Sequence, residues 1–318
     1  MIFQVVIILV ILSVVCVVYA ADSSPYIVFE GFSWAENLAF DGRGGLFVSD
    51  AIKGELWKIM YNDTSSQYDG QIFLKKGATQ FGGLAISNDG LHIYAGAVME
   101  DKSMALIQAS TLVPLAFDIL TATPHLANGL AADFKRGVLY FTDEGTGEKM
   151  DGTVTAYNLN TGTLLGVVAH VPSADGAFFD AENDKLFVGE LVSKKVHVFS
   201  VSDSGISLDS VNVALSDAVG SLHIMDDLTL DRELTNMNEV GKTTLFGADW
   251  TGRKIQKFTL DGSSVSEVAV PEGITLKEPT SVRWGKGKGF DPNSLYVSEG
   301  GGATKLEHGR RIVQIPIA

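Results

Sequence analysis

Short segments in which apolar and polar residues alternate recur from residue 26 to the end of the chain. Each contains an apolar run, a turn and a second apolar run, as in NGLAADFKRGVLYFTD from Asn128 and DGAFFDAENDKLFVGE from Asp175. Alternation with a period of two predicts strands buried on one face, whereas a helical repeat would space apolar residues three and four apart. The pattern therefore predicts an all-β protein.

These strand pairs form an internal repeat. Six pairs begin about 46 to 54 residues apart, and each is followed by a third strand and usually a fourth, such as QIFL at Gln71. Four short antiparallel strands per unit of this length are typical of a propeller blade, so we predict a six-bladed β-propeller. The strand left over at the front, YIVFE at residues 26–30, is expected to pair with the last blade near RRIVQIPI and close the ring.

The chain opens with the apolar run MIFQVVIILVILSVVCVVYA and turns polar at Asp22. Small residues at Val18 and Ala20 predict a signal peptide, residues 1–20, followed by a single propeller domain, residues 21–318. We therefore expect a protein of the extracellular space or the secretory-pathway lumen, with no stable membrane insertion after cleavage. An uncleaved anchor is the alternative, because no Lys or Arg precedes the run and the run is almost long enough to span a bilayer.

The charge and the cysteine content of the chain indicate which partners it can bind and what stabilises its fold. The net charge of −14 and pI of about 4.8 argue against a nucleic-acid partner and favour cations. The single cysteine, Cys16, lies in the signal segment, so the mature chain would rely on its core and not on disulfides. The sequon Asn62-Asp63-Thr64 lies in a polar stretch and predicts a glycoprotein.

The repeat also locates a candidate site. In a propeller the innermost strands line the central channel, so the first residue of each strand pair would belong to one ring. The ring consists of Glu36, Gly82, Asn128, Asp175, Asp226 and Thr280. A lone Asp or Asn at a strand start usually caps a turn, but four oxygen donors in one register favour a metal site. Glu36, Asn128, Asp175 and Asp226 are the predicted ligands.

Three carboxylates in one channel repel one another and stay ionised only beside a cation. Oxygen donors without His or Cys select Ca²⁺, with Mg²⁺ or Mn²⁺ as alternatives. Asp226 could act as general base on water or as nucleophile, and Asp227 directly follows it. His125 and His223 each lie three residues before a predicted ligand and are candidate proton carriers, although loop histidines are more often plain surface residues.

A second set of acidic residues ends the second strands of five blades: Asp50, Asp143, Glu190, Asp249 and Glu299. Their uniform position predicts a structural role, namely a repeated hydrogen bond to the turn that follows.

The Glu of the first blade, the Asn of the third and the Asp of the fourth resemble the pattern of the regucalcin/gluconolactonase family. The adjacent acids in MDDLTLD resemble the calcium-binding segment of paraoxonases and diisopropyl fluorophosphatase. The resemblance covers roughly residues 30–316. It implies a calcium-dependent hydrolase of lactones, aryl esters or organophosphates, with Glu36, Asn128, Asp175 and Asp226 as ligands.

The second blade departs from these families. Sugar lactonases of the regucalcin group carry Arg-x-Asn-Asp-Gly there, and paraoxonases carry a catalytic His, whereas this chain has Thr79-Gln80-Phe81-Gly82-Gly83. The departure disfavours a sugar lactone and favours a more apolar substrate. Trp34, Phe81 and Asp227 are the predicted substrate contacts.

Two functions follow from these observations. The first is a secreted, monomeric, calcium-dependent hydrolase of the lactonase, arylesterase or phosphotriesterase type that acts on a small-molecule ester or lactone. The alternative is a non-catalytic propeller that calcium stabilises and that serves as a binding or interaction module.

Overall fold

The computed structural model describes residues 26–75, 77–146, 150–192, 195–203, 225–231, 243–260, 262–301 and 310–317, and the backbone of strands 205–207 and 213–214. The predicted signal peptide with Cys16, and the candidate His223, lie outside these residues. Strands, turns and bends account for all regular structure in the described ranges, which contain no helix. Accordingly, none of these residues belongs to a helix that could cross a membrane.

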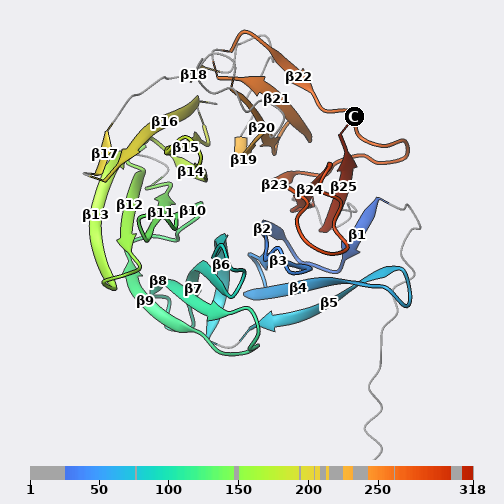
Figure 1. Cartoon of the computed structure of the whole chain (residues 1–318), viewed down its shortest axis with the longest axis horizontal. Coiled ribbons are helices and arrows are strands. Elements are labelled where there is room, and N and C mark those ends of the chain that lie inside the picture. Colours follow the sequence, from blue (N-terminus) through green and yellow to red (C-terminus); the bar gives the residue numbers. More distant parts are fainter. Residues whose placement is uncertain are drawn as a thin grey trace, which may run out of the picture.

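Six antiparallel sheets surround a central axis, which confirms the predicted six-bladed β-propeller (Figure 1). The first blade contains β2 (Ala35–Phe40), β3 (Gly45–Asp50), β4 (Glu55–Asn62) and β5 (Gln67–Leu74). The second contains β6 (Ala78–Ile86), β7 (His92–Met99), β8 (Met104–Ser110) and β9 (Asp118–Thr123). The third contains β10 (Leu130–Asp133), β11 (Val138–Asp143), β12 (Thr153–Asn158) and β13 (Thr163–His170).

The fourth blade contains β14 (Ala174–Asp180), β15 (Lys185–Glu190), β16 (Lys195–Ser202) and β17 (Gly205–Ser207), and β18 (Val213–Ala214) also pairs with β16. The fifth contains β19 (Met225–Leu230), β20 (Thr244–Asp249), β21 (Lys254–Thr259) and β22 (Val265–Glu267). The sixth contains β23 (Pro279–Trp284), β24 (Ser294–Glu299) and β25 (Arg311–Pro316). Its outermost strand is β1 (Ile27–Glu30), which pairs with β25, so the two ends of the described chain share one blade.

The hydrophobic core lies between neighbouring blades. One buried cluster joins Phe47 and Phe73 of the first blade to Phe81 and Ile93 of the second, and comparable clusters join later blades. Each sheet therefore buries apolar side chains on the faces that meet its neighbours, and the inner edges of the sheets are left to line the channel.

The inner strands are irregular where they begin. The pairing register shifts between Ala35 and Leu38, Phe81 and Leu84, Ala174 and Ala177, Met225 and Leu228, and Pro279 and Ser281. A bulge leaves residues out of the ladder and redirects their side chains, and bulges are frequent beside active sites. Five of the six predicted ring residues lie in these shifts, and the sixth, Asn128, precedes β10 and donates its backbone N–H to Thr142 O at 3.1 Å.

Glycine follows the ring residue in three blades because the next blade packs directly against it. A Cβ at Gly129 would lie 2.3 Å from Asp175 O, and a Cβ at Gly176 would lie 2.5 Å from the Cα of Asp227. Backbone atoms cannot move aside without shifting a blade, so these positions exclude larger residues.

Gly129→Ala is therefore expected to destabilise the protein by about 1–3 kcal/mol, as overpacking does in a close-packed interior. Chemical denaturation measures the change in the free energy of unfolding. Gly189→Ala is the matched control, because its Cβ would first meet the flexible side-chain ends of Leu228 and Met225, at 3.3 and 3.4 Å, and a backbone atom, Gly176 O, only at 3.6 Å. Equal stability of the two variants would contradict this tight inter-blade contact.

Candidate functional site

The four predicted metal ligands lie at one end of the channel, where the inner strands begin. Glu36 belongs to β2, Asp175 to β14 and Asp226 to β19, while Asn128 lies two residues before β10. Asn128 and Asp175 are in contact, since Asn128 Nδ2 donates to Asp175 Oδ1 at 2.5 Å. We call these four residues the acidic ring.

Glu144 also belongs beside this ring, and the sequence pattern did not identify it. Its Oε1 accepts a 2.8 Å hydrogen bond from Asn128 Nδ2, so the amide of Asn128 lies between two carboxylates, Glu144 and Asp175. The only signal in the sequence is its place directly after Asp143, the acid that ends β11.

An indole contacts Glu36, and a second indole packs beside the first. Trp34 Nε1 donates to Glu36 Oε2 at 2.5 Å, and the ring centroids of Trp34 and Trp250 lie 6.3 Å apart. Gly300 leaves room for Trp34, because a Cβ there would lie 2.6 Å from the indole. Trp34 thus lies beside a predicted ligand, and Trp250 is a further aromatic neighbour that the sequence pattern missed.

Burial and mutual repulsion raise the pKa values of the ring carboxyl groups. The pKa of Glu36 rises to about 7, chiefly because the side chain is buried, and Glu144 and Asp227 add to the effect by charge repulsion. Burial likewise raises the pKa of Asp175, with repulsion from Glu144 and Glu36, and that of Asp226, with repulsion from Glu36 and Asp175. Without a cation these carboxyl groups therefore tend to keep their protons, and a bound cation would stabilise their ionised form.

Asp227 supports the ring but does not face into it as a free carboxylate. It is buried, accepts a hydrogen bond from Ser281 Oγ at 2.5 Å and pairs with Arg283 Nη1 at 2.7 Å. Its other oxygen accepts the backbone N–H of Leu228 at 2.8 Å. These bonds occupy both carboxylate oxygens. Asp227 was predicted to contact the substrate, but its contacts are those of a residue that positions its neighbour Asp226.

Hydroxyl groups of neighbouring blades fix the backbone of the ring. Thr142 Oγ1 donates to Asp175 O at 2.5 Å, and Ser298 Oγ donates to Glu36 O at 2.7 Å. Because each bond crosses from one blade to the next, the spacing of the ring depends on the assembly of the whole propeller.

The other predicted residues take different places. Phe81 is fully buried in the core between the first two blades and does not reach the channel surface, so we do not retain it as a substrate contact. His125 is half-exposed, with Nε2 3.9 Å from Asp143 Oδ2. Asp143 directly precedes Glu144, so His125 lies near the ring although no bond joins it to a ring residue in the described structure.

The second set of acids makes structural contacts of two kinds. Asp50, Asp143 and Asp249 accept backbone N–H groups of the turns that follow them, as predicted. The two glutamates instead reach the adjacent third strands: Glu190 pairs with His197 and Glu299 with Arg311.

The donor types of the ring fit a hard divalent cation, because the four residues offer carboxylate and amide oxygens and no Cys or His side chain is among them. Within the described part of the chain, however, no three His, Cys, Asp or Glu side chains are already close enough to form a metal cluster. Coordination would require Asn128 to turn its amide oxygen inward and Glu36 to leave the Trp34 indole. Such side-chain rotations leave the backbone of the ring in place.

Solved structures of other proteins share the propeller fold of this chain. A calcium-binding regucalcin from Agrobacterium tumefaciens superposes with a TM-score of 0.64 and 13% identity, over 92% of this chain and 93% of that one. A gluconolactonase from Xanthomonas campestris gives 0.60 and 14%, over 92% and 89%. An auxiliary nutrient binding protein from Bacteroides ovatus gives 0.65 and 12%, over 89% and 69%.

At the level of sequence, no protein-family model matches the chain, and no curated protein matches it either. Identities this low carry information about the fold alone. The chain has the six-bladed propeller fold of gluconolactonase and regucalcin structures, the family that its blade pattern resembles.

Proposed function

We propose that this protein is a secreted, calcium-dependent hydrolase of small esters or lactones whose active site is the acidic ring. One observation carries the proposal. Three carboxyl groups on three different blades, Glu36, Asp175 and Asp226, have raised pKa values because they are buried together at one end of the channel. Strongly perturbed titratable groups in a recessed site are a mark of function.

Glu36, Asn128, Asp175 and Asp226 would hold the cation. Bound there, Ca²⁺ would polarise a carbonyl or phosphoryl oxygen and stabilise developing negative charge. Calcium-binding regucalcin among the structural neighbours supports this choice of metal, with Mg²⁺ or Mn²⁺ as alternatives.

Other side chains of the site would provide the general base, the proton carrier and the apolar contacts to the substrate. Burial raises the pKa of Asp226 well above its ordinary value, so it suits a general base on water, with direct attack on the substrate as the alternative. His125 would carry protons between the site and solvent, since its ring is half-exposed and Asp143 lies beside Nε2. The Trp34 and Trp250 indoles would hold the apolar part of a substrate and exclude water.

The second blade favours an aryl or aliphatic substrate over a sugar. Gly82 and Gly83 place no side chain at the ring, and Phe81 is turned into the core. That part of the site therefore offers no side-chain hydrogen bonds to sugar hydroxyl groups, although the neighbouring gluconolactonase is named for a sugar lactone.

The absence of side chains at Gly82 and Gly83 of the second blade also favours a second candidate function. A calcium-stabilised propeller without catalysis would need the acidic ring but not a complete substrate pocket. The likeness to an auxiliary nutrient binding protein supports this reading. A binding role predicts that calcium changes the melting temperature while no ester is turned over.

Hydrolysis of four substrates tests the proposal: an aryl ester, an aliphatic lactone, a sugar lactone and a phosphotriester, each with calcium and with a chelator. We expect turnover of the aryl ester or aliphatic lactone, reduced at least about a hundredfold by the chelator or by Glu36→Gln, because electrostatic stabilisation of the transition state would be lost. Glu267→Gln, the same change on the exposed outer strand β22, is the matched control and should retain full rate. Turnover that survives both the chelator and Glu36→Gln would contradict the proposal.

A further inference from the structure

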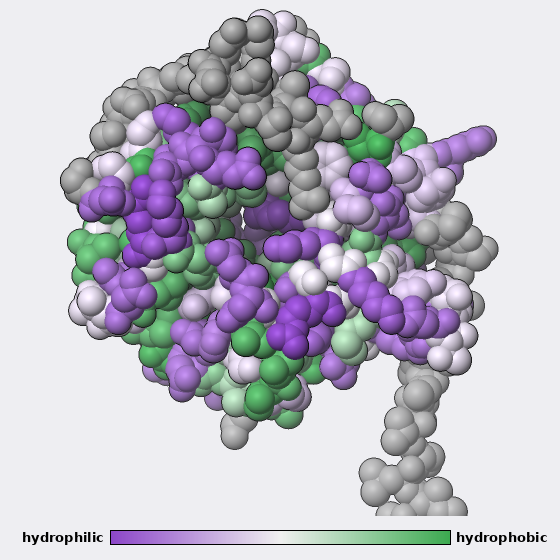
Figure 2. Space-filling model, in the orientation of Figure 1, coloured by the Kyte–Doolittle hydropathy of each residue, from purple (hydrophilic) through white to green (hydrophobic). Residues whose placement is uncertain are grey.

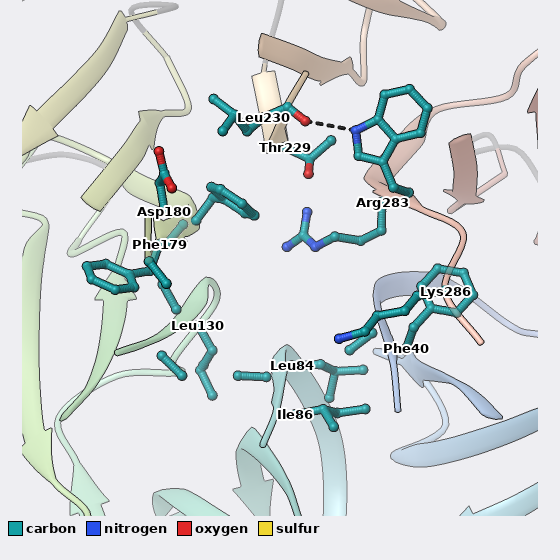
Figure 3. A pocket seen from close by; sticks show the side chains of 18 of the residues that line it. Phe40, Leu84, Ile86, Leu130, Phe179, Asp180, Thr229, Leu230, Arg283 and Lys286 are labelled. Carbon is teal, nitrogen blue, oxygen red and sulfur yellow. Dashed lines mark hydrogen bonds between the residues drawn. The ribbon is translucent and has the colours of Figure 1, made fainter. Parts of the chain in front are cut away.

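A cavity lies at the opposite end of the channel from the acidic ring. It has a volume of about 580 Å³ and is formed where the six inner strands end. Its apolar wall includes Phe40, Leu84, Ile86 and Leu130 (Figure 3). Sites for small organic ligands usually have this character, with an apolar wall, a few placed polar groups and a volume of about 300–1,000 Å³.

Arg283 brings a positive charge into this apolar space. Figure 3 shows its guanidinium group pointing toward the middle of the cavity. Its contacts all use Nη1, which bonds Asp227 Oδ2 at 2.7 Å, Val282 O at 2.8 Å and Leu228 O at 3.0 Å. Nε and Nη2 have no hydrogen-bond acceptor among the described residues, so two donor groups of a fixed guanidinium remain for a ligand.

Lys286 adds a second cation from the loop after β23. Its amine also points toward the cavity in Figure 3, and the side chain is exposed. No carboxylate in the described ranges forms an ion pair with it. Lys286 and the partly free Arg283 thus bring two cationic groups to the cavity of a protein whose net charge is −14.

The acidic residues of the cavity wall are engaged elsewhere. Asp180 accepts hydrogen bonds from Glu182 N at 3.0 Å and Asn183 Nδ2 at 2.7 Å, and its carboxylate is turned aside from the centre in Figure 3. Asp231 pairs with Lys257 at 2.9 Å, and Glu182 is exposed to solvent. These contacts leave Arg283 and Lys286 as the charged groups directed at an occupant.

We propose that this cavity binds an organic monoanion with a carboxylate head and an apolar tail or ring. The carboxylate would accept hydrogen bonds from Arg283 Nε and Nη2 and pair with Lys286, while the tail would pack against Leu84, Ile86 and Leu130. Arginine presents two parallel donors that match a carboxylate, and such charge-assisted bonds are stronger in an apolar surrounding. The site is distinct from the acidic ring, because its residues lie at the other end of the same strands, and among the described residues Arg283 is joined to the ring only through Asp227.

Calorimetric titration of the full-length protein with octanoate tests this site, both in calcium and in a chelator. We expect saturable binding under both conditions. Octylammonium, which carries the opposite charge on the same tail, and acetate, which lacks the tail, should bind at least about tenfold more weakly. Because Lys286 is exposed, Lys286→Glu should leave the fold intact and weaken octanoate binding by at least about tenfold.

Lys288→Glu is the matched control. It makes the same charge change two residues away on an exposed lysine that pairs with Asp63, and breaking such a surface pair costs little stability. We expect octanoate affinity to be unchanged in this variant. The proposal would be overturned by absence of saturable binding at millimolar octanoate, by equal binding of octylammonium, or by equal effects of Lys286→Glu and Lys288→Glu.

Discussion

Asp175→Asn is expected to abolish the thermal stabilisation that calcium confers and, at the same time, to make the calcium-free protein more stable. Asp175 is buried among Glu144, Glu36 and Asp227, and repulsion from these groups helps to raise its pKa. Asparagine has the same shape, keeps an acceptor for Asn128 Nδ2 and carries no charge. It therefore relieves repulsion in the empty ring but removes one of the three carboxylates that would neutralise Ca²⁺.

Melting temperatures of wild type and variant, with calcium and with a chelator at about pH 8, measure both effects. We expect the variant to gain about 1–3 kcal/mol in the chelator, in line with removal of a poorly compensated buried charge. Asp118→Asn, on the exposed outer strand β9, is the matched control and should change neither value. A variant that still responds to calcium as wild type does would remove Asp175 from the ligand set.

Without calcium, the protein is expected to lose stability as the pH rises from about 5 to about 8. The pKa of Glu36 is about 7 in the folded protein against an ordinary 4.5, so the native state binds more protons than the unfolded state between these values. The free energy of unfolding then falls as pH increases, on the order of 3 kcal/mol from Glu36 alone. Glu299, whose pKa burial raises to about 6, contributes in the same direction.

Urea denaturation in chelator at several pH values measures this loss. Saturating calcium should remove most of it, because the cation favours the ionised carboxylates, and Glu36→Gln should remove the share that belongs to Glu36. Asp184 has a lowered pKa of about 2, so it changes its protonation only at much more acidic pH and does not contribute to the change in stability between about pH 5 and about pH 8. Stability that is constant or rises over this range in chelator would contradict the electrostatic description of the ring.

The fold could be predicted from the sequence because the same strand pattern recurs in each of the six blades. Alternation of apolar and polar residues predicts each strand, and the recurrence of strand pairs predicts the blades. A strand that is ambiguous in one blade can therefore be assigned from the equivalent segments of the others. The same logic placed Glu36, Asn128, Asp175 and Asp226 at one end of the channel, since equivalent positions of a repeat must share a ring. The bulges in which most of these residues lie were not predicted, because the repeat indicates where each strand begins and not how its ladder is paired.

Residues outside the repeat register could not be placed in the same way. Glu144 and Trp250 follow the ends of second strands, and only folding brings Glu144 beside Asn128 and Trp250 beside Trp34. Phe81 precedes a ring position, but its large apolar side chain is turned into the core between blades. Asp227 adjoins Asp226, yet Ser281 and Arg283 of the next blade occupy its carboxylate.

Figure 2 shows one face of the propeller, with a hollow at the centre rimmed mainly by hydrophilic surface. The channel thus combines an acidic ring at one end and an apolar cavity with two cations at the other. The two ends of the channel differ because the inner strands all start at the same end, and the residues at their starts differ in type from those at their ends.

The most direct test is a crystal structure of the full-length protein grown with Ca²⁺, and with Mn²⁺ for its stronger anomalous signal. We predict one anomalous difference peak in the channel, with oxygen atoms of Glu36, Asn128, Asp175 and Asp226 at about 2.3–2.6 Å from Ca²⁺. A well-ordered channel with no peak, and with Trp34 still bonded to Glu36 and Asn128 Nδ2 still bonded to Asp175, would contradict the metal site and the calcium-dependent hydrolysis that rests on it.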